Sequence, residues 1–512
     1  MKLILAALLI STASMAKKVQ IIHTNDLHSF YFGPSRSGDG GYARVKTLID
    51  KLKADAEKNG IPSLVLDAGD FGEGSYQFLF DNGIGSFKAL DMLGVDAAVV
   101  GNHDHMFGGK MLSDQIKESG IQTQILGANI ATTADMKLKG LLKPSAVFDL
   151  DGIRVDVIGL TTDSLHFMHQ IRPGFIFPAA PVSRAYSKVA REDGSDLVIA
   201  LTHLGLDKDK RLAKDDPELD VIIGGHSHTR LDEVFKQINQ EERSIPIVQT
   251  GAHAMAVGSL ILDVKGPKDV EVVSYKLHDA FTSVHEDQEV KSFVEDVDYR
   301  ARRALAGNKW DSVIGTSEID LAGYVDGNQQ KFDGCWLKHL PKIIHEESGS
   351  NVGLYLSAFT GKAVPKGDIT YGNIIENFPH VNEYGRPGWE IMKFKINGWK
   401  LYTLLLALVS ADLDDSAPLI GGVKYSLFTF PDSIPWIGGV SFFTTLKING
   451  KTVDFSKKYE VALPFEFSRM LEGLLPKKFS SLFTKDFVRG DWYLWNMAEN
   501  YIKRKKVITC SN

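Results

Sequence analysis

The 512-residue chain has only two cysteines, Cys335 and Cys510, and they do not form the closely spaced cysteine pairs of structural zinc sites. An exported chain could join them in a disulfide, and two free thiols are the alternative. An excess of positive charge is also missing, because 58 Lys and Arg stand against 64 Asp and Glu, a net charge of −6. This balance argues against a nucleic-acid polymer as partner and leaves a small anionic substrate open.

Long hydrophobic runs are missing after the N-terminus, since the apolar segment 401–409 is too short to span a bilayer. At the N-terminus, Lys2 precedes the apolar run 3–10, and Ser14 and Ala16 are small residues two positions apart. This pattern predicts a cleaved signal peptide over residues 1–16 and therefore an exported protein, periplasmic or extracellular. A buried first strand or helix is the alternative. The sequence does not predict an oligomeric state.

The length predicts more than one domain. Residues 17–280 alternate short apolar runs with amphipathic segments such as 42–58, which is typical of a layered α/β domain. A charged helical segment, 281–308, is expected to link this domain to a second one over residues 309–512.

Polar side chains follow five of the predicted strands, at the point where each strand ends. The strands are 19–22, 62–66, 95–100, 196–201 and 220–223, and the polar residues are Asp26 and His28, then Asp70, then Asn102 and His103, then His203, and finally His226 and His228. The carboxyl ends of strands are where layered α/β folds place their sites. Each cluster taken alone is also consistent with a capped turn or a core histidine, but five in succession favour one shared site.

Seven of these residues are oxygen or nitrogen ligands and none is a thiolate, which suits two divalent ions such as Mn, Zn, Fe or Mg. We assign Asp26, His28 and His228 to one ion, Asn102, His203 and His226 to the other, and Asp70 to both. Two ions roughly 4 Å apart hold a bridging hydroxide and clamp phosphate oxygens for in-line attack. The neighbouring His103 then stabilises developing charge or helps the leaving oxygen depart.

Two further histidines, His105 and His253, are expected either beside the ligands or at the pocket edge, with plain surface positions as the alternative.

These motifs resemble those of the calcineurin-like metallophosphoesterases, which carry Asp-x-His, Gly-Asp, Gly-Asn-His, a lone His and Gly-His-x-His. More narrowly, residues 18 to about 280 are similar to the family of 5′-nucleotidases and UDP-sugar hydrolases, with His-Thr-Asn-Asp-Leu-His at 23–28, Asp-Ala-Gly-Asp at 67–70 and Gly-Gly-His-Ser-His at 224–228. The resemblance implies an α/β fold: a four-layered αββα metallophosphoesterase domain, a linking helix, and a second α+β domain that delivers the substrate. It also implies an exported enzyme that releases phosphate from nucleotides.

The second half resembles the family in scaffold, at 367–371 and 449–451, but departs where the family holds its substrate. Lys362 is the cation nearest to the position of the family's arginine, Ala417 stands where an aromatic residue stacks the base, and 468–471 replace a glycine-rich turn. We count Lys362, Phe430 and Phe467 as the substrate-binding candidates. If Phe430, Phe467, Phe442 or Phe443 lines the cleft between the domains, the base is still stacked by other residues, whereas a cleft without an aromatic pair weakens the case for nucleotides.

The catalytic part departs at one position, because Met106 stands where the resemblance leads us to expect an Asp three residues after the catalytic His103. Asp104 is the neighbouring carboxylate, and we count it with His103 and Asn102 as a catalytic candidate. These departures leave open the same hydrolysis on another substrate: a sugar phosphate, a cyclic nucleotide or a thiosulfonate. A non-catalytic binding protein is a further alternative, opposed by the complete ligand set, since seven buried polar residues would cost stability without metals.

Overall fold

The computed structural model describes most of the chain. Outside its described part lie residues 1–16, 35–37, 165–166, 169, 322–323, 326–328, 331–333, 357–359, 365, 380, 384–385, 388, 411–417, 432–438, 466, 469–487, 489, 491 and 511–512. The predicted signal peptide, Ala417 and residues 469–471 therefore fall outside the described residues.

The first half contains a seven-stranded sheet in the order β15-β14-β1-β2-β3-β4-β6. Its parallel part comprises β1 (Lys17–Thr24), β2 (Ser63–Asp67), β3 (Ala97–Val99), β4 (Gln124–Leu126) and β6 (Leu142–Lys143). Two long antiparallel strands, β14 (Ala256–Gly266) and β15 (Asp269–Asp279), extend the sheet beyond β1. Because the parallel strands run in one direction, their polar carboxyl ends lie at one edge.

A second sheet of six strands has the order β12-β13-β11-β10-β8-β7. Its strands are β7 (Ser145–Leu150), β8 (Ile153–Thr161), β10 (Leu197–His203), β11 (Val221–Gly224), β12 (Phe235–Ile238) and β13 (Ser244–Val248). The four strands β8, β10, β11 and β13 are parallel, and β7 and β12 are antiparallel edge strands.

The two sheets pack face to face, as the alternation along single strands shows. On β1, Val19 and Ile21 enter a core that also contains Val157 and Ile199 of the second sheet, whereas Ile22 enters the core on the opposite face. Successive side chains of a strand point to opposite faces, so each sheet needs cover on its outer side.

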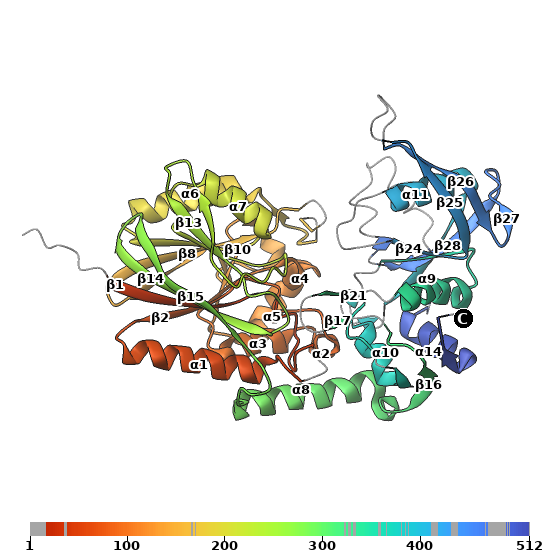
Figure 1. The fold of residues 1–512 in the computed structure, drawn as a ribbon, viewed down its shortest axis with the longest axis horizontal. Helices are drawn as coiled ribbons and strands as arrows, with labels where there is room; N and C mark the ends of the chain where they lie inside the picture. The colour runs from red at the N-terminus through yellow and green to blue at the C-terminus, as the bar shows by residue number, and fades with distance from the viewer. Residues whose placement is uncertain are drawn as a thin grey trace, which may run out of the picture.

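Helices supply that cover and complete four layers (Figure 1). The first sheet is covered by α1 (Tyr42–Lys58), α3 (Ile84–Leu93) and α5 (Gly109–Ser119). The second is covered by α6 (Ala179–Glu192) and α7 (Leu206–Asp215). The expected αββα arrangement is thereby confirmed.

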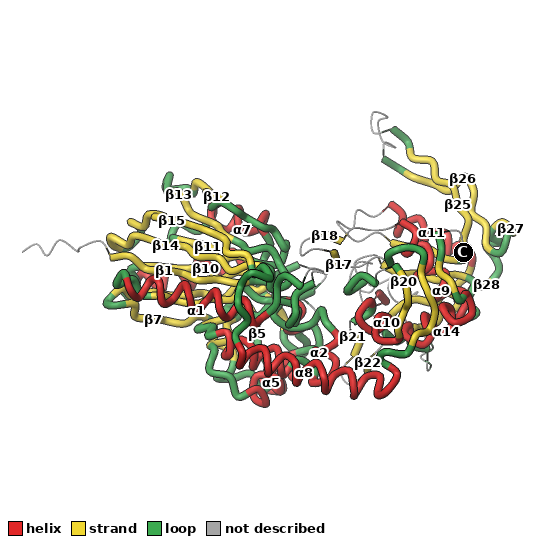
Figure 2. Tube along the Cα trace, turned by 60° about the horizontal axis from the view of Figure 1, so that its bottom comes forward, coloured by secondary structure: helices red, strands yellow, loops and turns green. Residues whose placement is uncertain are grey.

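A long helix, α8 (Gln288–Ala306), leads from this half to the rest of the chain. It packs against α1 and α2 (Tyr76–Asp81) and ends beside the second half (Figures 1 and 2). The side chain of Asp287 caps its first turn by accepting a hydrogen bond from the backbone N–H of Val290, 2.9 Å away.

The second half is a smaller α+β arrangement. A four-stranded sheet contains β23 (Ile391–Asn397), β28 (Lys458–Pro464), β19 (Val352–Leu356) and β24 (Pro418–Gly421), and a three-stranded sheet contains β20 (Gly367–Thr370), β16 (Val313–Ser317) and β29 (Val507–Ile508). The helices are α9 (Gly334–Ser348), α10 (Tyr371–Asn377), α11 (Gly398–Ser410) and α14 (Leu494–Lys505). This confirms the predicted second α+β part.

The remaining elements are short, apart from one hairpin that projects from the second half, formed by β25 (Val423–Thr429) and β26 (Ser441–Ile448) with β27 (Lys451–Thr452) (Figure 2). The short ones are β5 (Ile130–Ala131), β9 (Phe175–Ile176), β17 (Tyr324–Val325), β18 (Gln329–Gln330), β21 (Val381–Glu383), β22 (Arg386–Pro387), η1 (Ala134–Met136), η2 (Gly307–Lys309) and α4 (Asn102–His105).

Cys510 is disulfide-bonded, so of the two alternatives left open for this cysteine the structure has the bonded one. Among the helices that the structure describes, none combines the length and the apolar character needed to cross a membrane.

Candidate metal centre

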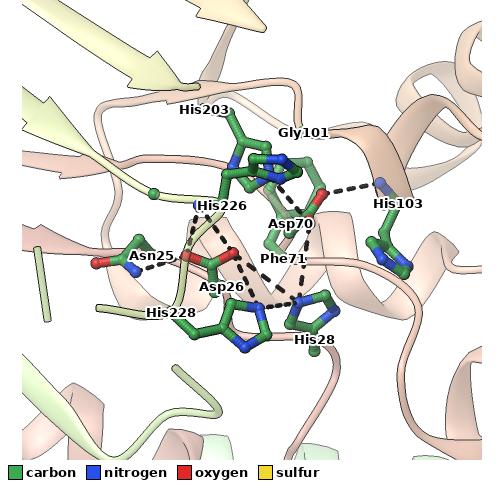
Figure 3. A network of polar contacts seen from close by, with 12 residues as sticks. Asn25, Asp26, His28, Asp70, Phe71, Gly101, His103, His203, His226 and His228 are labelled. Carbon is green, nitrogen blue, oxygen red and sulfur yellow. Dashed lines mark hydrogen bonds and ion pairs between the residues drawn. The ribbon is translucent and has the colours of Figure 1, made fainter. Parts of the chain in front are cut away.

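The polar residues that follow the strands converge at one edge of the paired sheets (Figure 3). Asp26 and His28 come from the loop after β1, Asp70 from the loop after β2, and Asn102 from α4, which follows β3. From the second sheet, His203 ends β10, and His226 and His228 follow β11. The seven ligand candidates named from the sequence are therefore brought together.

The backbone of this cluster is unusual, because five of its residues other than glycine have a positive φ. The values are 52° at Asp26, 49° at His28, 53° at Asp70, 78° at His226 and 51° at His228. Residues with side chains rarely adopt this left-handed conformation, and it costs on the order of 1–3 kcal/mol each. Such strain concentrates at functional sites, where it orients side chains that packing alone would not place.

Asp70 lies in the middle of the cluster. Its Oδ2 is 3.0 Å from Nε2 of His203 and 3.8 Å from Nε2 of His28, and its Oδ1 accepts a hydrogen bond from the backbone N–H of His103 at 2.8 Å. One carboxylate oxygen thus faces both halves of the cluster. This is the geometry expected of a ligand shared between two ions.

Two groups of ligand atoms flank Asp70. In the first, Nε2 of His28 is 3.1 Å from Nε2 of His228, and Oδ1 of Asp26 is 3.4 Å from His228 and 3.9 Å from His28. In the second, ligand atoms of Asp70, His203 and His226 all lie within 4.8 Å of one another. The assignment of the seven residues to two ions stays a prediction.

Backbone carbonyls hold two of the imidazoles in one orientation. Nδ1 of His28 is 2.7 Å from the carbonyl oxygen of Glu73, and Nδ1 of His203 is 2.8 Å from that of Ala68. A carbonyl only accepts, so each Nδ1 carries a proton and each Nε2 is the ring nitrogen turned toward the cluster. Imidazole ligands of metals are commonly fixed in this way.

Several protonation states suit cation binding. Burial, reinforced by neighbouring imidazoles, lowers the pKa of His28 to about 4 and that of His226 to about 3. Burial opposes the charge on Asp26, but His228 outweighs it and lowers the pKa of Asp26 to about 2. At neutral pH His28 and His226 are therefore neutral and Asp26 is ionised, the forms that bind metals. Burial opposes a positive charge on His203, but the carboxylate of Asp70 outweighs burial and raises the pKa of His203 to about 10, so this imidazole gives up a proton when it binds a cation.

One buried polar atom of the ligand candidates, Oδ1 of Asn102, lacks a hydrogen-bond partner in the part of the chain that the structure describes. An unsatisfied buried polar atom costs about 1–3 kcal/mol, so this oxygen needs an explanation. A divalent cation coordinated by its lone pair supplies one, and the residues present fit such ions.

His103 lies beside the ligands, with Nδ1 at 2.6 Å from Oε2 of Glu73. Burial opposes a positive charge on this imidazole, but the carboxylates of Asp70 and Glu73 outweigh burial and raise the pKa of His103 to about 9. The ring is thus held protonated, and its side chain is 29% exposed, so that it is accessible from the solvent side.

Asp104 has contacts that differ from the catalytic role expected of it. Its Oδ2 accepts hydrogen bonds from the backbone N–H groups of Asp70 and Gly101, and its Oδ1 accepts one from Gly72, at 2.8–2.9 Å. Burial, with the nearby charge of Asp70, raises the pKa of Asp104 to about 7. Asp104 therefore ties the loop after β2 to the loop after β3, and its catalytic role stays a prediction.

The two histidines left open by the sequence are both buried, which excludes the surface alternative. His105 is fully buried, and burial lowers its pKa to about 4. His253 is 1% exposed, donates its backbone N–H to the carbonyl oxygen of Asp26, and has ligand atoms near those of His28 and His228. His253 thus lies beside the first group.

The residues expected to hold substrate lie in different surroundings. Lys362 forms an ion pair with Glu376 at 3.3 Å and lines a pocket of about 250 Å³ together with Ser29 and Gly74, which directly follow His28 and Glu73. The ring of Phe430 contacts the rings of Phe428 and Phe442 of the projecting hairpin at an angle. Phe443 is buried against Tyr402.

Phe467 is 1% exposed and packs in the core of the four-stranded sheet with Phe394 and Leu463. A ring enclosed in this way has no face left for a nucleobase in this conformation, which corrects the expectation that Phe467 stacks substrate. Phe467 instead contributes to the hydrophobic core of the second half.

Sequence reasoning missed two residues of the site, Glu73 and Asn25. Asn25 donates to Oδ2 of Asp26 at 2.6 Å and accepts from the backbone N–H of Thr250 at 2.7 Å, which ties the first loop to the segment after β13. Asn25 stands inside the recognised motif 23–28, and Glu73 follows the motif 67–70 by three residues. Their polar character in a glycine-rich or turn segment was the available signal.

Comparison with known proteins decides the family of the first half. The model of the calcineurin-like phosphoesterases matches residues 19–230. These residues form a calcineurin-like phosphoesterase domain. The match spans the segments that carry all seven ligand candidates, so the resemblance read from the motifs is confirmed for this part of the chain.

Two relatives match more than half of this chain, and one of them is named a 5′-nucleotidase. "Protein 5NUC" of Lutzomyia longipalpis is 29% identical over 336 residues, 60% of this chain and 57% of that protein. A 5′-nucleotidase of Vibrio cholerae is 26% identical over 416 residues, 72% of this chain and 73% of the relative. The chain thus spans little more than half of the first relative and about three quarters of the second.

Among solved structures, the 5′-nucleotidase precursor from Thermus thermophilus superposes with a TM-score of 0.75, at 22% identity, over 96% of this chain and 97% of that one. This likeness shows that the phosphoesterase domain and the second α+β part together share a known two-part fold.

Proposed function

We propose that the chain is a di-metal hydrolase of phosphate esters, with nucleotides as its leading substrate class. The observation that carries the proposal is the position of Asp70 between two groups of ligands, together with the buried Oδ1 of Asn102, which has no hydrogen-bond partner among the described residues. The nucleotidase names of the relatives support the substrate class.

In this proposal Asp26, His28 and His228 hold one divalent ion and Asn102, His203 and His226 hold the other, with Asp70 contacting both. When bound, the ions supply positive charge for the phosphate oxygens and make a water molecule more acidic. The candidates are Mn, Zn, Fe and Mg, because all ligands are oxygen or nitrogen.

The residues around the ions divide the remaining work. His103, protonated and beside Asp70, is placed to donate a proton to the leaving oxygen of the ester. The carbonyls of Glu73 and Ala68 keep two imidazoles aimed inward. Asp104 holds the loops that carry Asp70 and Asn102 at their spacing.

A different substrate is the second candidate, and the placement of the expected substrate residues favours it. Lys362 is paired with Glu376, Phe467 is enclosed in a core, and Phe430 lies on the projecting hairpin. The same hydrolysis on a sugar phosphate or a thiosulfonate would not need a stacked base, and a cyclic nucleotide is the further alternative.

The test is phosphate release by the protein from Lys17 onward with added Mn, from AMP, UDP-glucose, a 2′,3′-cyclic nucleotide, a sugar phosphate and an aryl phosphate diester. A second enzyme frees phosphate from diester products, and each assay is repeated with a chelator. Chelator-sensitive release from AMP well above the aryl ester supports a nucleotidase. Release from the aryl ester alone rejects the nucleotide substrate, and no release from any ester rejects the hydrolase.

We also propose that the chain is divided into a first domain over 17–280, a linking helix over 281–308 and a second domain over 309–512. We further propose that residues 1–16 direct export of the protein. The course of α8 over Gln288–Ala306 supports the first. Limited proteolysis checks the division, since cuts should fall in the segments that flank α8. N-terminal sequencing of the protein from the producing cells checks export, which predicts a start at Lys17.

A further inference from the structure

Glu73 lies in the loop that carries Asp70, three residues further along the chain. It is 1% exposed, and its backbone has a positive φ of 28°. The next residue, Gly74, has a φ of 142°, and a Cβ there would lie 2.8 Å from Cβ of His28. The loop is therefore pressed against His28 in a conformation that most residues avoid, which fixes the direction of the Glu73 side chain.

Two different groups of Glu73 contact the cluster. Its carbonyl oxygen accepts from Nδ1 of His28 at 2.7 Å, and its carboxylate Oε2 lies 2.6 Å from Nδ1 of His103. The short distance and the ionised acceptor are typical of a charge-assisted hydrogen bond. Such a bond resists rotation of the ring more strongly than a bond between neutral groups.

Other candidates for the partner of His103 are occupied or apolar. Asp104 is the adjacent carboxylate, but both of its oxygens accept from backbone N–H groups. Met106 follows α4 and offers no charge. The carboxylate of Asp70 accepts a hydrogen bond from the backbone N–H of His103. Among the described residues it has no hydrogen bond with a ring nitrogen of His103.

We propose that Glu73 is the positioning residue of His103, holding Nδ1–H of the ring so that Nε2 is the nitrogen presented to the leaving oxygen of the ester. The inference rests on the proposed function for the role of Nε2, and on the contact alone for the orientation. Glu73 acts through His103 and does not touch the substrate. As a water molecule forms a bond to phosphorus and loses a proton to solvent, the bond from phosphorus to the leaving oxygen breaks and the proton of Nε2 moves to that oxygen. Nδ1 keeps its own proton, which stays hydrogen-bonded to Oε2 of Glu73.

The test compares Glu73→Gln with wild type on two phosphate monoesters, AMP and an aryl phosphate with a good leaving group. AMP needs proton donation at its leaving oxygen and the aryl ester needs little, so kcat for AMP should fall by about 100-fold and kcat for the aryl ester by less than about 10-fold, at nearly constant KM. Metal content per chain should stay at the wild-type value, because the carbonyl that holds His28 is unchanged. Equal losses on both esters, or loss of metal, would overturn the proposal.

A matched control is Glu286→Gln, which removes a carboxylate paired with Arg44 at 3.1 Å and Lys291 at 2.8 Å, away from the cluster. It should change neither kcat. A purely structural Glu73 would lower both rates together with thermal stability, whereas a positioning Glu73 separates the two esters.

Spectroscopy separates this proposal from the proposed function. In protein labelled with ¹⁵N-histidine, the His103 signal, identified by its loss in His103→Gln, should report a hydrogen-bonded Nδ1–H in wild type and a changed signal in Glu73→Ala. An unchanged signal would overturn the orienting contact even if the esters are hydrolysed. If no ester is hydrolysed but the signal changes, the proposed function fails and the orienting contact stands.

Discussion

Replacing Gly101 by alanine adds one methyl group at the point where two ligand loops meet. The new carbon would lie 2.1 Å from Oδ1 and 2.4 Å from the backbone nitrogen of Asp70. Gly101 has a φ of −89° and a ψ of 178°, which alanine adopts without strain. The substitution therefore tests how the position of Asp70 affects the site, because the added methyl group clashes with Asp70 and does not strain the backbone of residue 101.

The expected displacement follows from these distances. An ordinary carbon contact begins near 3.4 Å, so Asp70 must move by about 1 Å from the added methyl group. Metal ligands tolerate deviations of about 0.2 Å, and a misplacement of about 1 Å at a reacting centre can cost about 100-fold in rate. We expect Gly101→Ala to bind less metal and to lose about 100-fold in kcat/KM on whichever ester of the panel is hydrolysed fastest.

Metal content and steady-state kinetics on the same preparation measure both effects. Gly120→Ala is the control, because Gly120 ends α5 with a φ of 66° and has open space around it. Alanine there should lower the unfolding free energy by about 1 kcal/mol and leave metal content and rate unchanged. A Gly101→Ala protein with wild-type metal content and a rate within about twofold of wild type would refute the bridging position of Asp70.

Two further predictions concern stability. Asp104→Ala should lower the unfolding free energy by about 3 kcal/mol, because three backbone N–H groups lose their acceptor at about 1 kcal/mol each. Chemical denaturation measures this loss, and a value below about 1 kcal/mol would contradict the prediction. Burial raises the pKa of Asp209 in the folded chain to about 7, above its unfolded value of about 3.9, so the folded state binds the extra proton and stability falls as pH rises between these values. Asp209→Asn should therefore gain about 2 kcal/mol over wild type between about pH 5 and about pH 7 in chelated protein, and a difference that does not change with pH would contradict the buried acid.

The strands and helices that position the site could be predicted from the sequence because their apolar residues are periodic. The helix predicted at 42–58 forms as α1 over Tyr42–Lys58, and the strand predicted at 196–201 forms as β10 over Leu197–His203. The seven ligands could be named because each follows such a strand. Parallel strands then bring their ends together.

The partner of His103 could not be predicted, because the contact with Glu73 joins two loops that are 30 residues apart in the chain. Asp104 was the nearer choice in sequence, yet adjacent residues of a helical turn do not face each other. The segment predicted as a tight turn forms the short helix α4 instead, and this turns Asp104 toward the backbone of the neighbouring loop.

The choice of Phe467 failed for a different reason. An aromatic residue near a missing motif looks available in the sequence, but burial depends on what the other strands place around it. Phe394 and Leu463 enclose this ring. The residues that other strands place around a side chain cannot be predicted from the sequence next to it.

The most direct test of the central claim is the number of divalent ions bound per chain, measured by inductively coupled plasma mass spectrometry after loading with Mn and removal of excess metal. The account predicts two ions per chain in the wild-type protein and a loss of binding in Asp70→Ala, since Asp70 contacts both groups of ligands. Wild-type protein without bound metal, or an Asp70→Ala variant that retains two ions, would contradict it.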